Sequence, residues 1–153
     1  MNYLLPTFQR GHWLITQHNH PMLVKLYERH YSANKHVSIQ KRMQNGVSGP
    51  GEAMCLLTLA CDAGWIWGHE KFRLDDQEGV QCRFFRNEGP LLSSILIEEA
   101  VERAWERWPN ERLWTYINPS KIRSSNPGFC FQCAGWHVCG KSKGGLVVLE
   151  MRT

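Results

Sequence analysis

An imidazole and a phenol stand next to each other at His30 and Tyr31, close to the end of a predicted helix. Histidine gives and takes protons near neutral pH, so the pair offers a general base beside a hydroxyl group. Side chains of these kinds also serve as ligands for transition metals such as iron. Adjacent residues at a helix end equally suit capping and packing. The pair therefore indicates proton transfer, metal binding or a structural role.

A second group of polar residues follows the strand predicted for residues 113–117. Because ligands bind at the carboxyl ends of strands in sheets that helices flank, this loop is a candidate substrate or nucleic-acid site. Prolines follow two of its asparagines, which favours turn geometry with the amide groups still able to hold a base. The group consists of Asn118, Lys121, Arg123, Ser124, Ser125 and Asn126. We take Asn118, at the strand end, as the catalytic candidate among them.

Two arginines and an asparagine lie in the strand predicted for residues 80–87, which leads into a helix. Period-two alternation predicts one face with Cys82, Phe84 and Arg86 and another with Arg83, Phe85 and Asn87. A guanidinium group here can hold phosphate or carboxylate, or it can form a surface ion pair. One of the two arginines should face the helix layer, which leaves the other for a ligand.

Residues 32–51 are polar and glycine-rich, and they include Lys35, Lys41 and Arg42. A structureless connection of this length is uncommon in a compact domain unless it serves as a lid or a binding segment. We therefore expect this segment to be mobile, with Lys41 and Arg42 contacting nucleic-acid phosphates.

Four soft metal ligands fall close together at Cys130, Cys133, His137 and Cys139. The C-x-x-C spacing admits zinc. The cluster is too compact for the usual second half-site, and its first two cysteines fall in a predicted short helix beside phenylalanines. We therefore predict core thiols.

The elements that position these residues form one domain spanning residues 1–153. Apolar alternation and turn signals predict strands at residues 12–17, 52–60, 65–67, 80–87 and 113–117. Helical spacing and caps predict helices at residues 21–30, at 128–134 with Asn126 as cap, and from Ser93 or Ser94 to Pro109. The fold class is α/β, or α+β layered, with a mixed central β-sheet flanked by helices.

Composition narrows the setting of this domain. A formal net charge of +4 and a pI near 8.8 favour contact with polyanions without requiring it. The six cysteines lack the spacing of a disulfide framework and no signal segment precedes them, so we expect a reduced, cytoplasmic compartment. The longest apolar run is too short to span a bilayer, so no membrane association is expected.

The motif N-P-G-F-C-F-Q-C-A-G-W at residues 126–136, followed by Gly140, Lys141 and the strand G-L-V-V-L-E, resembles the last third of GNAT-type N-acyltransferases. With the His30-Tyr31-Ser32 signature and the glycine-rich segment after it, the chain is most similar to the phage Mom-like DNA-modification proteins, a divergent branch of that fold. Such proteins protect phage DNA against restriction.

This resemblance implies transfer of a glycine-derived carbamoylmethyl group to the N6 amine of adenine in DNA, in the cytoplasm of a bacterium that carries the phage or prophage. It implies that His30, Tyr31, an arginine of the 80–87 strand and Asn118 lie near the reacting centre. It also associates an iron ion with the site, for which His30 and Tyr31 are candidate ligands. The group donor is unknown.

One segment departs from the GNAT pattern. A glycine-rich loop normally holds the coenzyme A pyrophosphate on backbone N–H groups, whereas residues 86–93 here read R-N-E-G-P-L-L-S. Glu88 should repel phosphate and Pro90 removes a donor, so we expect weak or absent acetyl-coenzyme A binding. Two alternatives stay open: a conventional acyl-CoA-dependent N-acetyltransferase acting on a small amine or a protein, and a non-catalytic DNA-binding module. The module would grip DNA through Lys41, Arg42, Lys121, Arg123, Lys141 and Lys143.

Overall fold

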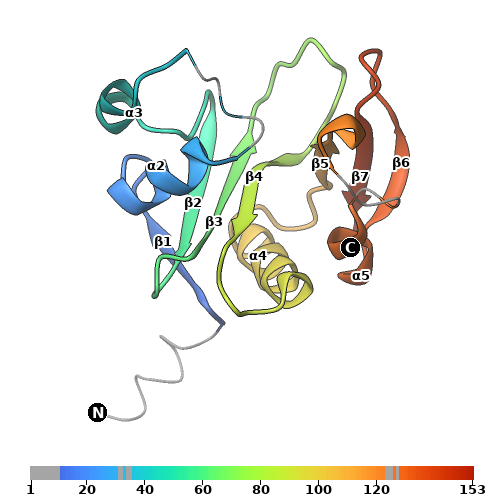
Figure 1. Ribbon diagram of the computed structural model, residues 1–153. Helices are drawn as coiled ribbons and strands as arrows, with labels where there is room; N and C mark the ends of the chain where they lie inside the picture. Colours follow the sequence, from blue (N-terminus) through green and yellow to red (C-terminus); the bar gives the residue numbers. More distant parts are fainter. Residues whose placement is uncertain (1–10, 31–32, 34–35, 123–125, 127) are drawn as a thin grey trace.

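A single seven-stranded sheet organises the chain (Figure 1). The computed structural model describes residues 11–30, 33, 36–122, 126 and 128–153. The elements are, in order, β1 (Trp13–Thr16), α2 (Pro21–Glu28), α3 (Ile39–Asn45), β2 (Glu52–Thr58), β3 (Ala63–His69), β4 (Val80–Asn87), α4 (Ser93–Arg107), β5 (Leu113–Ile117), the 3-10 helix η2 (Pro119–Lys121), α5 (Phe129–Cys133), β6 (His137–Lys141) and β7 (Val147–Met151).

The sheet is mixed, as the sequence predicts. Its strand order is β1-β2-β3-β4-β5-β7-β6, and β4 with β5 is the parallel pair among otherwise antiparallel neighbours. The strands β5, β7 and β6 and the helix α5 lie at the opposite end of the molecule from β1, α2 and α3 (Figure 1). The parallel pair β4–β5 therefore joins the two halves of the sheet.

Helices cover both faces of the sheet. On one face, Leu23 and Leu26 of α2 pack with Ile66 and Phe84. On the other face, α4 and α5 cover a larger cluster that contains Trp65, Trp67 and Trp136. Burial of one such leucine or isoleucine side chain contributes roughly 1.5–3 kcal/mol. Because both faces are covered, β2 and β3 are almost continuously buried rather than alternating.

The segment that we expected to lack regular structure contains the helix α3. The Ser38 side chain caps it by accepting a hydrogen bond from the Lys41 N–H, and Gly46 ends it at a φ of 79°. The prediction of a structureless loop is therefore wrong for residues 39–45. Arg42 lies buried in this helix, so it is not the exposed cation that the sequence suggested, whereas Lys41 is exposed.

Other boundaries also differ in detail from the sequence predictions. The N-cap of α4 is Leu92 and that of α5 is Gly128, and neither side chain caps its helix, so the predicted serine and Asn126 caps are wrong. The exposed strand β6 was not predicted, because its residues show no apolar alternation. Among the described residues, none of the helices combines the length and the apolar character that a membrane span requires.

Candidate active site

The two parallel central strands separate partway along their length. β4 pairs with β5 from Val80 to Cys82, opposite Leu113 to Thr115, and the pairing ends there. Beyond Cys82, β4 continues for five residues to Asn87 without a strand partner on that side. A cleft therefore opens between the carboxyl-terminal halves of these strands, where ligands bind in sheets of this kind.

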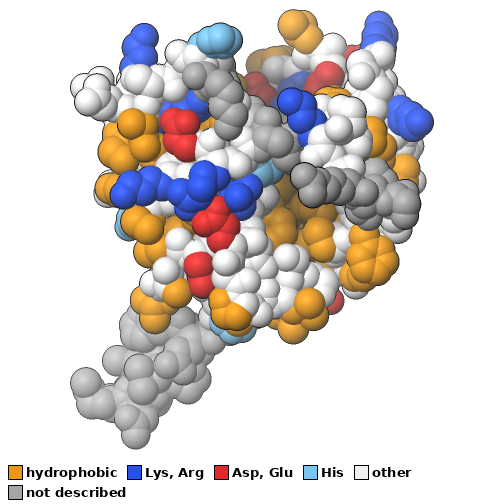
Figure 2. Space-filling view, in the orientation of Figure 1, with side chains coloured by type: hydrophobic (Ala, Val, Ile, Leu, Met, Phe, Trp, Pro, Cys, Tyr) orange, Lys and Arg blue, Asp and Glu red, His pale blue; other side chains and the backbone are white. Residues whose placement is uncertain are grey.

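Two adjoining cavities occupy this cleft. The larger, of about 450 Å³, is lined mainly by apolar side chains of β4, β5 and α5, including Phe84, Phe85 and Phe131. The smaller, of about 280 Å³, reaches Asn118 and Lys121. Both are lined by His30, Cys82, Arg83 and Tyr116. Figure 2 shows a hollow lined by hydrophobic side chains on a face that a band of Lys and Arg side chains also crosses.

A β-bulge in β4 lies at the point of separation. Ile66 of β3 pairs with Phe84 and the next residue, Trp67, pairs with Cys82, so Arg83 has no partner across the strands. The extra residue reverses the alternation, which places Cys82 and Phe84 in the core clusters of opposite faces. The predicted common face for Cys82, Phe84 and Arg86 is therefore wrong.

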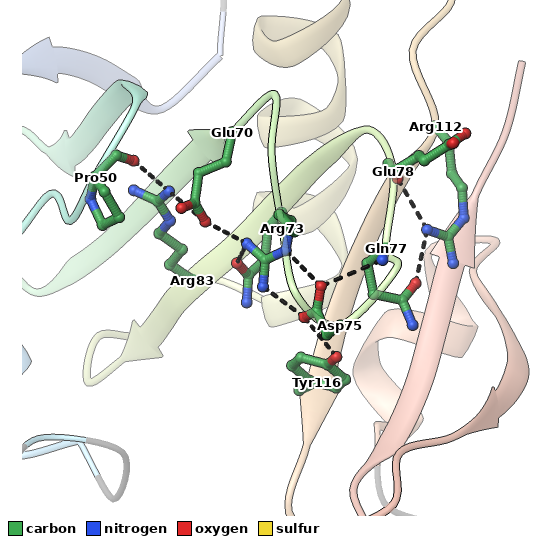
Figure 3. A network of polar contacts seen from close by, with 10 residues as sticks. Pro50, Glu70, Arg73, Asp75, Gln77, Glu78, Arg83, Arg112 and Tyr116 are labelled. Carbon is green, nitrogen blue, oxygen red and sulfur yellow. Dashed lines mark hydrogen bonds and ion pairs between the residues drawn. The ribbon is translucent and has the colours of Figure 1, made fainter.

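Arg83, at the bulge, holds neighbouring loops in place (Figure 3). Its guanidinium donates to the backbone carbonyls of Ser48 and Pro50 and lies 3.4 Å from the Glu70 carboxylate. Burial lowers its pKa, and the Glu70 charge opposes that shift. Arg83 borders both cavities and its described hydrogen bonds hold the loop of Ser48 and Pro50, while the catalytic role expected from the sequence stays a prediction.

His30 lies directly after α2 and borders both cavities, close to the position that the sequence suggested. Its backbone N–H donates to the Tyr27 carbonyl at 3.0 Å. Its ring packs edge-on against Phe84, with 5.1 Å between ring centroids. This contact fixes the imidazole at the wall of the cleft. Tyr31, the other half of the predicted pair, lies outside the described residues.

Only one of the two expected iron ligands, His30, lies among the described residues. The side chains that line the two cavities include no carboxylate. Across the described part of the chain, no group of three His, Cys, Asp or Glu side chains is placed to hold a metal ion. The iron site expected at His30 and Tyr31 therefore stays a prediction.

The polar loop after β5 is shaped by its own side chains. The Asn118 side-chain oxygen accepts from the Ser120 N–H at 3.1 Å and from the Ser120 hydroxyl at 2.7 Å, which caps η2. Asn126 and Gln132 exchange two amide hydrogen bonds of 3.2 and 3.4 Å. Asn118 borders the smaller cavity and Asn126 the larger. Lys121 is exposed at the smaller cavity; Arg123, Ser124 and Ser125 lie outside the described residues.

The segment after β4 is organised by ion pairs. Glu88 accepts hydrogen bonds from Arg29 at 2.7 Å and from Arg86 at 2.5 Å. These two bonds lower the pKa of Glu88 to about 2, and the bond from Arg29 has the larger effect. The carboxylate that we expected to repel phosphate is thus held between two guanidinium groups. Arg86 is engaged here rather than in the cleft. The Asn87 amide donates to the Leu91 carbonyl and the Ser93 hydroxyl, so it shapes this segment.

Tyr116 is the cleft residue that the sequence reasoning missed. Its hydroxyl donates to Asp75 at 2.8 Å, and burial together with that carboxylate raises its pKa. Arg73 holds the same carboxylate through bonds of 2.8 and 2.7 Å, and this pairing lowers the pKa of Asp75 well below its usual range. Tyr116 lies in the aromatic strand W-T-Y-I, a pattern that favours core packing. No residue near it in the sequence indicates that Asp75 is its partner.

The cysteine cluster divides between the cleft and the surface. Cys130 joins Cys82 at the wall of the larger cavity, and burial raises the pKa of both thiols. Cys133 and Cys139 are exposed, which contradicts the prediction of core thiols for these two. The fourth member, His137, lies 2.9 Å from Glu150 instead of facing the cysteines.

No protein-family model matches this chain, and no curated protein matches it either. Among solved structures, it is similar to a chain named as a GnaT-family acetyltransferase from Bordetella pertussis. The two share 9% sequence identity and a TM-score of 0.60, over 94% of this chain and 96% of the other. At this identity the similarity concerns the fold. The protein therefore has the GNAT fold, a seven-stranded mixed sheet flanked by helices.

Proposed function

We propose that this protein is a group transferase that attaches a small group to an amine, with the cleft between β4 and β5 as its active site. One observation carries the proposal: the strands separate beyond Cys82 into two adjoining cavities that share His30 as a wall residue. Two connected compartments suit a reaction that joins a donor to an acceptor. The structural neighbour is named as an acetyltransferase, which agrees with a group-transfer activity.

In the proposed reaction, the acceptor nitrogen attacks an electrophilic carbon of the donor. The new bond is N–C, and the leaving group departs with the electron pair of the bond that breaks. The nitrogen loses one proton, which the His30 imidazole takes as general base. The Tyr116 hydroxyl donates its one proton to Asp75, so toward the same cavities it offers a hydrogen-bond acceptor.

We further propose that the acceptor is the exocyclic N6 amine of adenine in DNA and the transferred group carbamoylmethyl. Two features support this choice. The larger cavity is lined by Phe84, Phe85 and Phe131, and aromatic and apolar walls are what a pocket for an extruded base requires. Exposed Lys121 at the smaller cavity and exposed Lys41 on α3 supply cations for the DNA backbone.

Mass spectrometry of nucleosides tests the proposal. The protein is expressed in a bacterium, the DNA is digested to nucleosides, and the digest is compared with that from cells carrying the empty vector. We expect a new adenosine-derived species with the mass of one added carbamoylmethyl group. Unmodified DNA from cells that contain the folded protein would contradict the proposal, and strongly salt-dependent DNA binding without any mass change would indicate a binding module instead.

A conventional acyl-CoA-dependent acetyltransferase is the second candidate, and the start of α4 favours it. No side chain caps this helix and no acidic residue lies in its first turn, so its N-terminal N–H groups suit an anion. In the preceding segment, the Glu88 carboxylate is paired with Arg86 and with Arg29 from the end of α2, so its charge is offset. Titration with acetyl-coenzyme A separates the candidates: micromolar binding with a raised melting temperature favours acetyl transfer, and no binding favours a different donor.

A further inference from the structure

The loop between β3 and β4, residues 70–79, exposes two large apolar side chains. Phe72 is 92% exposed and Leu74 105% exposed, the highest values among the large hydrophobic residues that the structure describes. Exposed apolar groups that are held together on one segment commonly mark a contact surface. Lys71, directly before them, is also exposed.

This loop is anchored tightly at the residue between the two apolar side chains. The Arg73 guanidinium turns inward and bonds to Asp75, to Glu70 at 2.5 Å and to Gln81 at 2.9 Å (Figure 3). It also lies 4.8 Å from the centre of the Trp114 ring. Phe72 and Leu74 are therefore exposed on a segment that the contacts of Arg73 hold in place.

The anchor also ties the loop that carries this apolar pair to the cleft. Asp75, next to Leu74 in the chain, accepts the hydrogen bond from Tyr116, whose side chain borders both cavities. Gln81, which Arg73 contacts, borders the smaller cavity. The same network thus holds the exposed loop and one wall of the candidate active site.

We propose that Phe72 and Leu74 form a wedge that enters the base stack of duplex DNA beside the adenine that the cleft receives. This inference rests on the proposed modification of DNA. A base in a duplex must be extruded before it reaches a pocket, which costs a few kcal/mol of stacking and pairing energy. Apolar side chains that insert between base steps lower that cost by filling the vacated space and unstacking the neighbours.

The charges around the wedge are of both signs. Arg73 and Arg83 pair with the loop carboxylates of Glu70 and Asp75, while Lys71 beside the wedge is exposed. The two other acidic residues, Asp76 and Glu78, border a separate surface depression, where Arg112 and Arg152 pair with Glu150. The apolar pair is thus flanked by exposed Lys71 on one side, while exposed Asp76 follows on the other.

A double variant, Phe72→Ala with Leu74→Ala, tests the wedge. Both side chains are fully exposed, so their truncation should leave the melting temperature almost unchanged. The matched control is Leu59→Ala, which removes another exposed leucine, 84% exposed, from the turn between β2 and β3. The probes are one oligonucleotide that carries 2-aminopurine in place of adenine, used as a duplex and as a single strand, together with the nucleoside content of DNA from expressing cells.

We expect wild type and Leu59→Ala to raise 2-aminopurine fluorescence in the duplex, because the base leaves the stack. The double variant should lose most of this fluorescence increase, and the amount of modified nucleoside in DNA should fall at least tenfold. Its affinity for the single strand should stay at the wild-type level. Wild-type modification and fluorescence in the double variant would overturn the wedge and leave the proposed function standing. A wild-type protein that neither modifies DNA nor binds the duplex would overturn both. Binding to anionic phospholipid vesicles is measured as well. If the double variant loses vesicle binding that the wild type shows, and still modifies DNA, the wedge is overturned and the pair belongs to a membrane surface.

Discussion

The guanidinium group of Arg83 occupies the space where a side chain at position 68 would lie. A Cβ added to Gly68 would come within 2.1 Å of the Arg83 Cζ and Nε atoms. Gly68 lies in β3 beside the bulge, and the space above it lets Arg83 reach the carbonyls of Ser48 and Pro50. Because Gly68 of β3 has no side chain, Arg83 of β4 can reach across it and hold the loop that contains Ser48 and Pro50.

Gly68→Ala should therefore displace Arg83. We expect the free energy of unfolding to fall by about 1–3 kcal/mol, because the displaced guanidinium loses charge-assisted hydrogen bonds. The control is Gly144→Ala in the turn between β6 and β7, where an added Cβ has nothing closer than 3.9 Å. Its effect should stay within about 0.5 kcal/mol. Urea denaturation measures both, and equal stability of the two variants would contradict the contact.

Neighbouring cations on α3 should behave differently from each other. Arg42 is buried and lies 2.6 Å from Glu28 and 5.0 Å from the centre of the Tyr27 ring. Arg42→Ala should lower the free energy of unfolding by about 3 kcal/mol, since it leaves a partly buried carboxylate without this partner. Lys41→Ala should change stability by less than about 0.5 kcal/mol. It should instead lower the slope of DNA affinity against salt by about one unit. The reverse pattern would show that Arg42 is the DNA contact.

The Glu88 ion pairs predict how stability depends on acidity. Because the folded pKa of Glu88 is lowered from 4.5 to about 2, its contribution is fully present above pH 4.5 and is lost as the pH falls toward 2. Glu88→Gln should therefore have a lower melting temperature than wild type at neutral pH, and the gap should narrow between pH 4.5 and pH 2. A gap that stays constant through this range would contradict the pairing with Arg29 and Arg86.

The fold was largely readable from the sequence because its main elements carry strong periodic patterns. The apolar spacing of α4, the apolar run of β2 and the alternation of β4 predicted these elements and their order along the chain, and the fold comparison confirms the layered class. The short helix α3 was missed because it buries a cation, Arg42, where the pattern requires an apolar residue.

The candidate site was predicted only in part, because it depends on contacts between distant segments. His30 falls at the cleft, but the bulge at Arg83 is produced by pairing with β3 and leaves no local signal in the sequence. Tyr116 and Asp75 are 41 residues apart. The pairing of Glu88 with Arg29 joins α2 to the segment before α4, so its neutralised charge could not be inferred from residues 86–93.

Comparison of two histidine variants tests the central claim most directly. His30→Ala removes the proposed base from the cleft, and His137→Ala removes a histidine that pairs with Glu150 on β7. DNA from bacteria that express each protein is digested and its modified adenosine is quantified per folded protein. We predict the wild-type level for His137→Ala and a loss of roughly a hundredfold or more for His30→Ala, with little change in its melting temperature. A His30→Ala protein that still produces the modified nucleoside at the wild-type level would contradict the assignment of His30 and the cleft to the chemistry.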